Sequence, residues 1–157
     1  MSAPGRVAEA LRAAGIEPHV REFPQGTRTA VDAAAAVGCE VGQICKSLVF
    51  RVEPAGGPLL VIASGAGRVD EERAGALVGG RLTKADADLV RRWTGFAIGG
   101  VPPLGHVEPL PTLFDEALLA YDVVWAAAGT PTSVFSVPPA TLAAATRARV
   151  AAVSRDG

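Results

Sequence analysis

Lys46 is the residue of this sequence whose presence is hardest to explain by folding alone. It lies within Ile44-Cys45-Lys46-Ser47-Leu48-Val49-Phe50, a run typical of a buried or half-buried strand. An ammonium group in such a strand loses hydration, so it needs either a path to water or a partner that requires a cation. Because the chain has thirteen arginines and only two lysines, a compact cation at this position suggests a functional site. A strand-edge lysine that extends to solvent is the alternative.

A second candidate site is a loop that combines glycines and prolines, Gly99-Gly100-Val101-Pro102-Pro103-Leu104-Gly105-His106. Glycine lets the main chain approach a ligand, whereas proline fixes φ and removes a donor. Such a loop can hold N–H groups in the direction needed to grip a carbonyl or form an oxyanion hole. A structural corner between strands is the alternative. His106 has no recognisable acid or serine partner, so by itself it is not assigned as a general base.

Composition and charge narrow the classes of partner. The formal net charge of -1 gives no overall field that attracts nucleic acid, so an RNA partner must be held locally. The spacing of Cys39 and Cys45 matches neither a zinc pair nor C-x-x-C, and no metal site is expected. There is no apolar stretch typical of a signal peptide or a membrane span, so we expect a cytoplasmic protein with no membrane partner. The length predicts one domain over residues 1–157.

Two further motifs have simpler explanations. Residues 60–67 begin like a strand that leads into a dinucleotide-binding loop, but the third glycine is missing and Asp70 would oppose a pyrophosphate. A tight turn capped by Asp70 is the better interpretation. Arg91-Arg92-Trp93 could stack on and neutralise RNA, as could the pair Arg147 and Arg149, although most such groups are solvated helix faces.

Capping residues, turns and apolar periodicity predict the elements that must position these residues. Helices are expected over residues 3–14, 30–37, 71–77, 84–93 and 140–145. Strands are expected over residues 18–23, 47–52, 59–63, 107–110, 121–126 and 133–137, with 47–52 and 59–63 forming a hairpin. Since the elements show no regular βαβ order, the predicted fold class is α+β (mixed α/β), with a curved, partly barrel-like mixed sheet and flanking helices.

In this order, the segments resemble the YbaK/ProX family of aminoacyl-tRNA editing proteins, which is related to the editing domain of bacterial prolyl-tRNA synthetases. The resemblance covers nearly the whole chain and rests on four segments: Thr27 to Ala35, Gln43 to Phe50, Arg92 to His106, and Leu113-Phe114-Asp115. It implies a trans-editing deacylase that hydrolyses the ester between a wrong amino acid and proline tRNA. It implies no cofactor, and a prolyl-tRNA synthetase could act as a carrier for a monomer or homodimer.

The resemblance also implies roles for individual residues. Lys46 corresponds to the essential lysine of the family, with Gly99 and Gly100 of the loop beside it in the catalytic set. The residues implied to line the substrate pocket are Thr29, Ser64, Val101, Pro102, Pro103, Gly105, His106 and Ser133. We expect Lys46 and the loop around Gly100 to form opposite walls of one small cavity.

The sequence departs from the branch of the family that acts on cysteinyl-tRNA. An aspartate of that branch is replaced here by Ser133 or Val134, and a tyrosine is replaced by Phe23. Cysteine specificity is therefore in doubt, and alanine, serine, threonine or a small non-protein amino acid remain open.

Two other functions remain open. One is a non-catalytic tRNA-binding or regulatory module of the same fold. The other is a small-molecule enzyme that uses Lys46 as a Schiff-base amine.

Overall fold

The structure is a computed structural model that describes residues 2–23 and 29–155. Residues 27 and 28, which begin one of the segments that carry the family resemblance, lie outside the described residues.

Short-range capping sets most of the helix boundaries. Ser2, Thr29, Asp70 and Asp86 each accept a hydrogen bond from the N–H three residues later, which satisfies a donor that the helix itself leaves free. The helices are α1 (Ala3–Ala13), α2 (Ala30–Val37), α3 (Glu71–Val78), α4 (Ala87–Thr94) and α5 (Pro139–Ala145), with 3-10 turns η1 (Val41–Gln43) and η2 (Glu116–Ala120). The helices expected over 3–14, 30–37, 71–77 and 140–145 are therefore confirmed.

The strands of the described chain form two sheets. The strands are β1 (Val20–Glu22), β2 (Cys45–Glu53), β3 (Gly57–Ser64), β4 (Arg81–Lys84), β5 (Thr112–Asp115), β6 (Val124–Ala127), β7 (Ser133–Val137) and β8 (Arg149–Ala151). The larger sheet has the order β4-β2-β3-β5-β8, and the smaller has the order β1-β7-β6. The β2–β3 hairpin is antiparallel, whereas β5 pairs in parallel with both β3 and β8, so the larger sheet is mixed as expected.

The two sheets do not close into a barrel, so that part of the expectation is not confirmed. In the described chain their connection by β-pairing is a single bridge between Ile44 and Trp125. Beyond this bridge, β6 pairs with β7 instead of continuing along β2. The fold is thus α+β with two open sheets.

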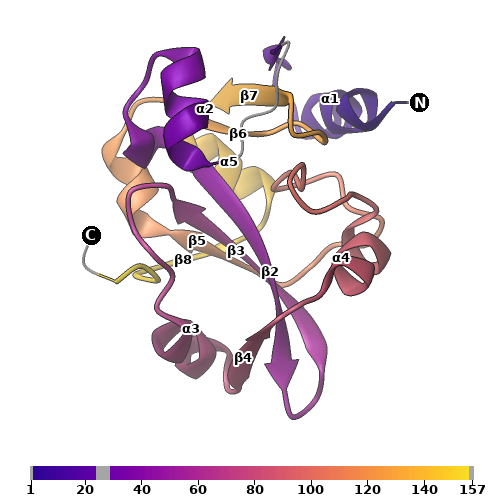
Figure 1. The fold of residues 1–157 in the computed structure, drawn as a ribbon, viewed down its shortest axis with the longest axis vertical. Helices are drawn as coiled ribbons and strands as arrows, with labels where there is room; N and C mark the ends of the chain where they lie inside the picture. Colours follow the sequence, from indigo (N-terminus) through magenta and orange to yellow (C-terminus); the bar gives the residue numbers. More distant parts are fainter. Residues whose placement is uncertain (1, 24–28, 156–157) are drawn as a thin grey trace.

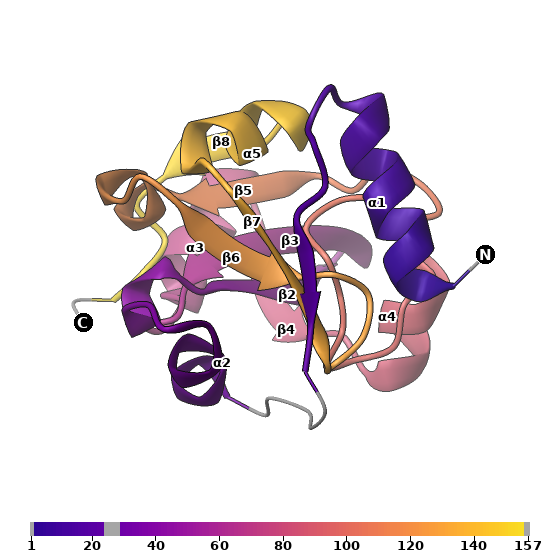
Figure 2. The ribbon, with the colours of Figure 1, turned by 90° about the horizontal axis from the view of Figure 1, so that it is seen from above.

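The small sheet lies across one end of β2, and α3 and β4 lie towards its other end (Figure 1). Seen from above, β6 and β7 lie over β2 and β3, with α1 and α2 on opposite sides (Figure 2). The space between the sheets is filled by the largest buried cluster, which includes Val49, Leu60, Phe96, Phe114 and Phe135. This packing fixes β2, and with it Lys46, against the small sheet.

Three expected elements were placed wrongly. The helix expected over 84–93 begins only at Ala87, because residues 81–84 pair with the end of β2 as β4. The strand expected over 107–110 is irregular, and the strand of this region is β5, which begins at Thr112. The strand expected over 121–126 begins at Val124. In each case, pairing with a distant strand decided the boundary.

Candidate active site

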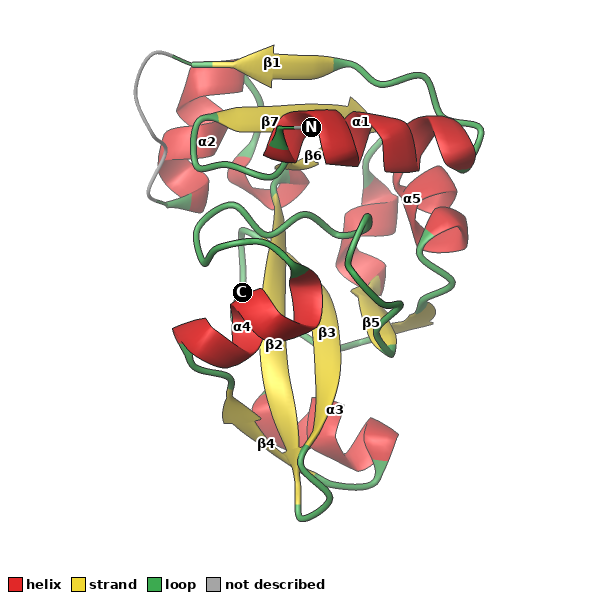
Figure 3. Ribbon diagram, turned by 90° about the vertical axis from the view of Figure 1, so that its right-hand side faces the viewer, coloured by secondary structure: helices red, strands yellow, loops and turns green. Residues whose placement is uncertain are grey.

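Lys46 and Gly99 line the same cavity, which has a volume of about 690 Å³. Its walls come from β2, the start of α2, the segment from Lys84 to Val90 and the loop after α4. Figure 3 shows α4 in front of β2, with this loop running from α4 towards the small sheet. The lining residues are Thr29, Ala30, Val31, Cys45, Lys46, Ser47, Leu48, Val49, Gly65, Lys84, Ala85, Val90, Ile98, Gly99, Val101 and Ala127. The lining is mostly apolar, as is usual for a small-molecule site.

A smaller cavity of about 120 Å³ adjoins the first. Both are lined by Thr29, Ala30, Cys45, Lys46, Gly99 and Ala127. The smaller one extends under the small sheet to Ser133, and no Asp or Glu is among its lining residues. Lys46 and Gly99 therefore lie where a large and a small compartment meet.

The ammonium group of Lys46 is held by a main-chain carbonyl. Its Nζ donates to the Gly67 carbonyl oxygen at 2.7 Å. Burial lowers the pKa of Lys46, and the nearby charge of Arg68 lowers it further, whereas Asp115 opposes this shift. An ammonium has three N–H donors, and the other two have no hydrogen-bond partner within residues 2–23 and 29–155, so they can serve a ligand. Lys46 is thus a positioned cation that gives up its proton more easily than an exposed lysine.

A buried carboxylate anchors the turn that holds Lys46. Asp115 is 1% exposed, and it accepts hydrogen bonds from the N–H of Ser64 at 3.1 Å and the N–H of Ala117 at 3.0 Å. The hydroxyl of Ser154 also donates to it. Since Ser64 begins the turn that carries Gly67, Asp115 supports the position of the lysine from behind.

Cys45 is a buried thiol on the wall of both cavities. Burial raises its pKa, and the negative charge of Asp115 raises it further. The thiol therefore stays neutral, which does not favour Cys45 as a nucleophile.

The glycine-proline loop contributes two of its residues to the cavity. Gly99 and Val101 line it, and neither N–H has a hydrogen-bond partner among the described residues. Gly99 has φ of 97°, a conformation that favours glycine. The N–H of Gly100 donates to the Ala97 carbonyl at 3.1 Å, and Gly100 is not a lining residue. The structure thereby narrows the available loop donors to Gly99 and Val101.

The rest of the loop packs into the protein. Pro102 and Pro103 are buried and have no N–H to offer, and neither lines the two cavities. His106 Nε2 donates to the Pro102 carbonyl at 2.7 Å, and burial lowers the pKa of this histidine. Gly105 packs on α1, where an added Cβ would lie 3.2 Å from the Ala10 Cβ. These four residues hold the loop in shape and do not contact the cavity.

The three hydroxyl residues expected in the pocket are placed differently from one another. Thr29 lines both cavities and caps α2 through its Oγ1. Ser133 lines the smaller cavity and shares a hydrogen bond of 2.7 Å with Thr130. Ser64 lines neither, because its Oγ faces away and donates to the Gly42 carbonyl at 2.8 Å. Ser64 lies opposite Cys45 in the β2–β3 pairing, but its hydroxyl does not reach the cavity that Lys46 lines.

Several cavity residues were missed by the sequence analysis. Lys84 is the chain's other lysine, and its rarity was the one signal that could have identified it. Gly65 lines the cavity, and an added Cβ there would lie 2.6 Å from the Val41 carbonyl oxygen. Val31 and Ile98 are 66% and 57% exposed at the cavity. Apolar side chains left exposed around a cavity are typical of a binding site.

The part of the chain that the structure describes contains neither a cluster of metal-ligating side chains nor a membrane-spanning helix. No group of three or more His, Cys, Asp or Glu side chains in residues 2–23 and 29–155 is arranged to hold a metal ion. No helix in the same ranges is long and apolar enough to cross a membrane.

Comparisons with known proteins agree with this architecture. The chain belongs to the aminoacyl-tRNA editing domain family, which matches residues 24–145. The expected relationship to YbaK-like editing proteins is thereby confirmed, and an aminoacyl-tRNA is the class of substrate implied by the family.

Individual relatives cover most of the chain. A candidate trans-editing enzyme for prolyl-tRNA synthetase is 50% identical, with a TM-score of 0.93 over 99% of both chains. A scaffold protein used for grafting linear epitopes is 45% identical, with a TM-score of 0.92 over 100% of this chain and 99% of that chain. The uncharacterised protein YwhH of Bacillus subtilis strain 168 is 29% identical over 123 residues, 78% of each chain.

Proposed function

We propose that this protein is a trans-editing deacylase that hydrolyses the ester of proline tRNA charged with a small wrong amino acid. Residues 1–157 would act as one editing domain. The observation that carries the proposal is that Lys46 and Gly99, far apart in the sequence, line one cavity. Membership of the editing-domain family and the similarity to a candidate trans-editing enzyme for prolyl-tRNA synthetase support it.

The reaction needs little covalent chemistry from the protein. Water adds to the ester carbonyl, the bond from that carbon to the ribose oxygen breaks, and the ribose oxygen takes the proton. The products are the free amino acid and the intact tRNA. Since the ester is already activated, the protein must mainly position the ester and water and stabilise the negative oxygen that forms.

Lys46 and two main-chain N–H groups supply this stabilisation in our proposal. The Gly67 carbonyl fixes the ammonium at 2.7 Å and leaves two of its protons for the substrate. The N–H groups of Gly99 and Val101, which have no partner in the described part of the chain, would bind the carbonyl oxygen as it becomes an oxyanion. The neutral thiol of Cys45 is not needed as a nucleophile, and His106 is engaged with Pro102.

The two compartments suggest how the substrate is divided. The cavity of about 120 Å³ would hold the side chain of the amino acid, and that of about 690 Å³ would hold the terminal nucleoside. Lys46, which lines both, would then lie beside the ester. A small compartment excludes large side chains firmly but separates small ones weakly, since one methylene is worth about 1–3 kcal/mol. Because no Asp or Glu among the described residues lines the small compartment, we propose alanine, serine, threonine or a small non-protein amino acid, in preference to cysteine, as the rejected residue.

Delivery of the tRNA is the remaining part of the proposal. With a formal net charge of -1, the protein has no global attraction for RNA, so a prolyl-tRNA synthetase would present the substrate to a monomer or homodimer. Arg91 and Arg92, exposed in the last turn of α4, would make local contacts.

A panel of charged tRNAs tests the proposal. Proline tRNA carrying alanine, serine, threonine, cysteine or proline is incubated with the protein, and release of labelled amino acid is measured. We expect rapid release of at least one small residue and slow release of proline. Binding of tRNA without release of any of the five would instead support the non-catalytic module. Trapping of a borohydride-stable adduct on Lys46 with a carbonyl substrate would support the Schiff-base enzyme.

A further inference from the structure

One edge of β2 is open where it lines the large cavity. In an antiparallel strand, successive residues direct their N–H and C=O groups to alternate sides. The Gly65 N–H donates to the Ile44 carbonyl at 2.7 Å, so the main-chain N–H and C=O groups of Ile44, Lys46 and Leu48 point towards β3. The main-chain groups of Ser47 and Val49 must therefore point to the opposite edge of β2. The Ala85 N–H confirms this direction, since it donates to the Val49 carbonyl from that side at 3.3 Å.

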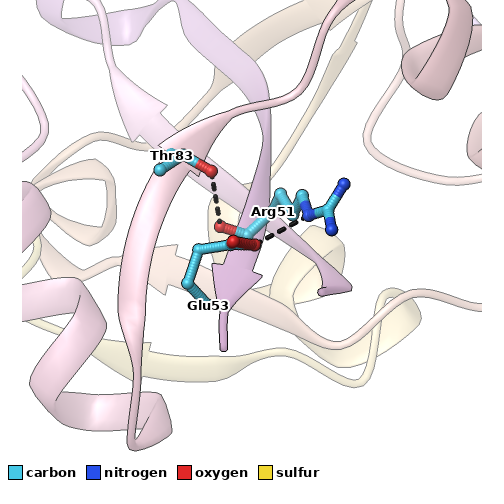
Figure 4. Close-up of polar contacts among 3 residues, drawn as sticks. All are labelled: Arg51, Glu53 and Thr83. Carbon is cyan, nitrogen blue, oxygen red and sulfur yellow. Dashed lines mark hydrogen bonds and ion pairs between the residues drawn. The ribbon is translucent and has the colours of Figure 1, made fainter. Parts of the chain in front are cut away.

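On that side, β4 covers only the far end of the strand. Its pairing runs from Phe50 to Glu53. Figure 4 shows this end, where the Thr83 hydroxyl donates to the Arg51 carbonyl at 3.4 Å and Arg51 contacts Glu53. Ser47 lies three residues before Phe50, so β4 does not pair with its main chain.

The N–H, C=O and hydroxyl groups of Ser47 have no hydrogen-bond partner within the described chain. Its N–H and C=O make no hydrogen bond to residues 2–23 or 29–155. Its Oγ is buried and has no partner among the same residues. Because the residue is only half-buried while this oxygen is buried, the exposed part of Ser47 is its main chain and Cβ. An unpaired donor and an unpaired acceptor thus lie side by side on the cavity wall.

The surroundings of this edge suit a flat aromatic ring that carries a phosphate. The apolar residues Val49, Val90, Ile98 and Val101 line the same cavity. Lys84 also lines it, has no ion pair within the described residues, and pairs with Phe50. At roughly 3.3 Å per residue, it lies about 10 Å along the edge from Ser47. A cation at this spacing can neutralise a phosphodiester joined to the ring through a ribose.

We propose that the main chain of Ser47 reads the adenine of the terminal nucleotide. The adenine N6 amino group would donate to the Ser47 carbonyl, and an adjacent ring nitrogen would accept from the Ser47 N–H. The unpaired acceptor and the unpaired donor of Ser47 would then each have a hydrogen-bond partner on the base. The inference rests on the proposed function, and it adds that the base itself, and not only the ester, is recognised.

Base analogues at the tRNA terminus test this directly. Alanyl proline tRNA is prepared with terminal adenosine, with purine riboside, which lacks only the N6 amino group, and with 3-deazaadenosine as the matched control. We expect kcat/KM for hydrolysis to fall about 5- to 150-fold with purine riboside, the range for leaving one buried partner unpaired. The 3-deaza substrate should match adenosine. In 1-deaza and 7-deaza analogues, one of the two should show a similar loss and so identify the ring nitrogen.

Two variants separate main-chain from side-chain recognition. Ser47→Ala keeps the main chain, so the ratio of adenosine to purine riboside rates should be unchanged, as in the control Ser136→Ala on β7. Its melting temperature should not fall, because an unpaired buried hydroxyl is removed.

Equal rates for adenosine and purine riboside would overturn the inference while leaving deacylation intact. A ratio of adenosine to purine riboside rates that falls to one in Ser47→Ala would overturn it as well, since the hydroxyl would then be the group that recognises the base. No hydrolysis of any alanyl, seryl, threonyl or cysteinyl tRNA would overturn the proposed function and this inference together.

Discussion

Replacing Lys46 by methionine removes the ammonium but keeps an unbranched stem of similar length. The charge lies at the junction of the two compartments, fixed 2.7 Å from the Gly67 carbonyl. Groups held in this way for a developing oxyanion are typically worth about 2.7–4 kcal/mol, or about 100- to 1000-fold in kcat. We therefore expect Lys46→Met to slow hydrolysis by two to three orders of magnitude.

The stability of the same variant should change little. The variant loses one hydrogen bond, but burial lowers the pKa of Lys46, which means that the fold disfavours the charged form. These effects oppose each other, so we expect the free energy of unfolding to change by less than about 1 kcal/mol. Slow hydrolysis can then be assigned to chemistry and not to unfolding.

Single-turnover release of labelled alanine from alanyl proline tRNA gives the rate of the chemical step, and urea denaturation gives the stability. Lys84→Met is the matched control, because it removes the other lysine of the same cavity at a site remote from Gly67. It should weaken binding, most visibly at low salt, and leave the single-turnover rate at saturation within about threefold. Equal single-turnover rates for wild type and Lys46→Met would refute the assignment.

Three further predictions follow from the surroundings of Lys46. If the lysine acts as a cation, the part of the rate that Lys46→Met abolishes should fall as pH rises through its lowered pKa, whereas a rise with pH would indicate a general base. Gly100→Ala should destabilise the fold by about 1–3 kcal/mol in urea denaturation and slow hydrolysis, because its Cβ would lie 2.6 Å from the Thr130 Cα; unchanged values for both would contradict the close packing. Asp115→Ala should cost about 3 kcal/mol or more in the same denaturation experiment, since the buried N–H of Ser64 and two part-buried donors lose their acceptor, and a loss below 1 kcal/mol would show that the network is dispensable.

The sequence predicted well those elements whose boundaries depend on neighbouring residues. Thr29 and Gly38 bound α2 as expected, the first by accepting from Asp32 and the second by adopting φ of 78°. The β2–β3 hairpin and β7 also lie where they were expected. For α2 and the β2–β3 hairpin, the deciding interaction joins residues that are close in sequence, so the sequence shows it directly. Strand β7 was also predicted correctly, although it lies between β6 and the distant β1.

The sequence failed where a distant partner decides the structure. Residues 81–84 carry no strong strand pattern, but they pair with residues 50–53 as β4. Residues 149–151, which were not expected to form a strand, pair with β5 across the chain. Ser64 follows an apolar strand, as a pocket residue would, yet its hydroxyl turns towards Gly42 and its N–H towards Asp115.

The candidate site divides in the same way. The sequence by itself singled out Lys46 and the loop from Gly99, because a lysine in an apolar strand and a glycine-proline turn are unusual wherever they occur. Only the tertiary structure decided that Gly99 and Val101 face the cavity while Gly100, Pro102 and Pro103 do not. It also decided that the pairing of β4 with β2 ends at Phe50, which leaves Ser47 without a main-chain partner among the described residues. An unusual residue in its local context can be recognised from the sequence alone. The direction of a hydrogen-bond donor and the openness of a strand edge depend instead on which strands pair across long separations in sequence.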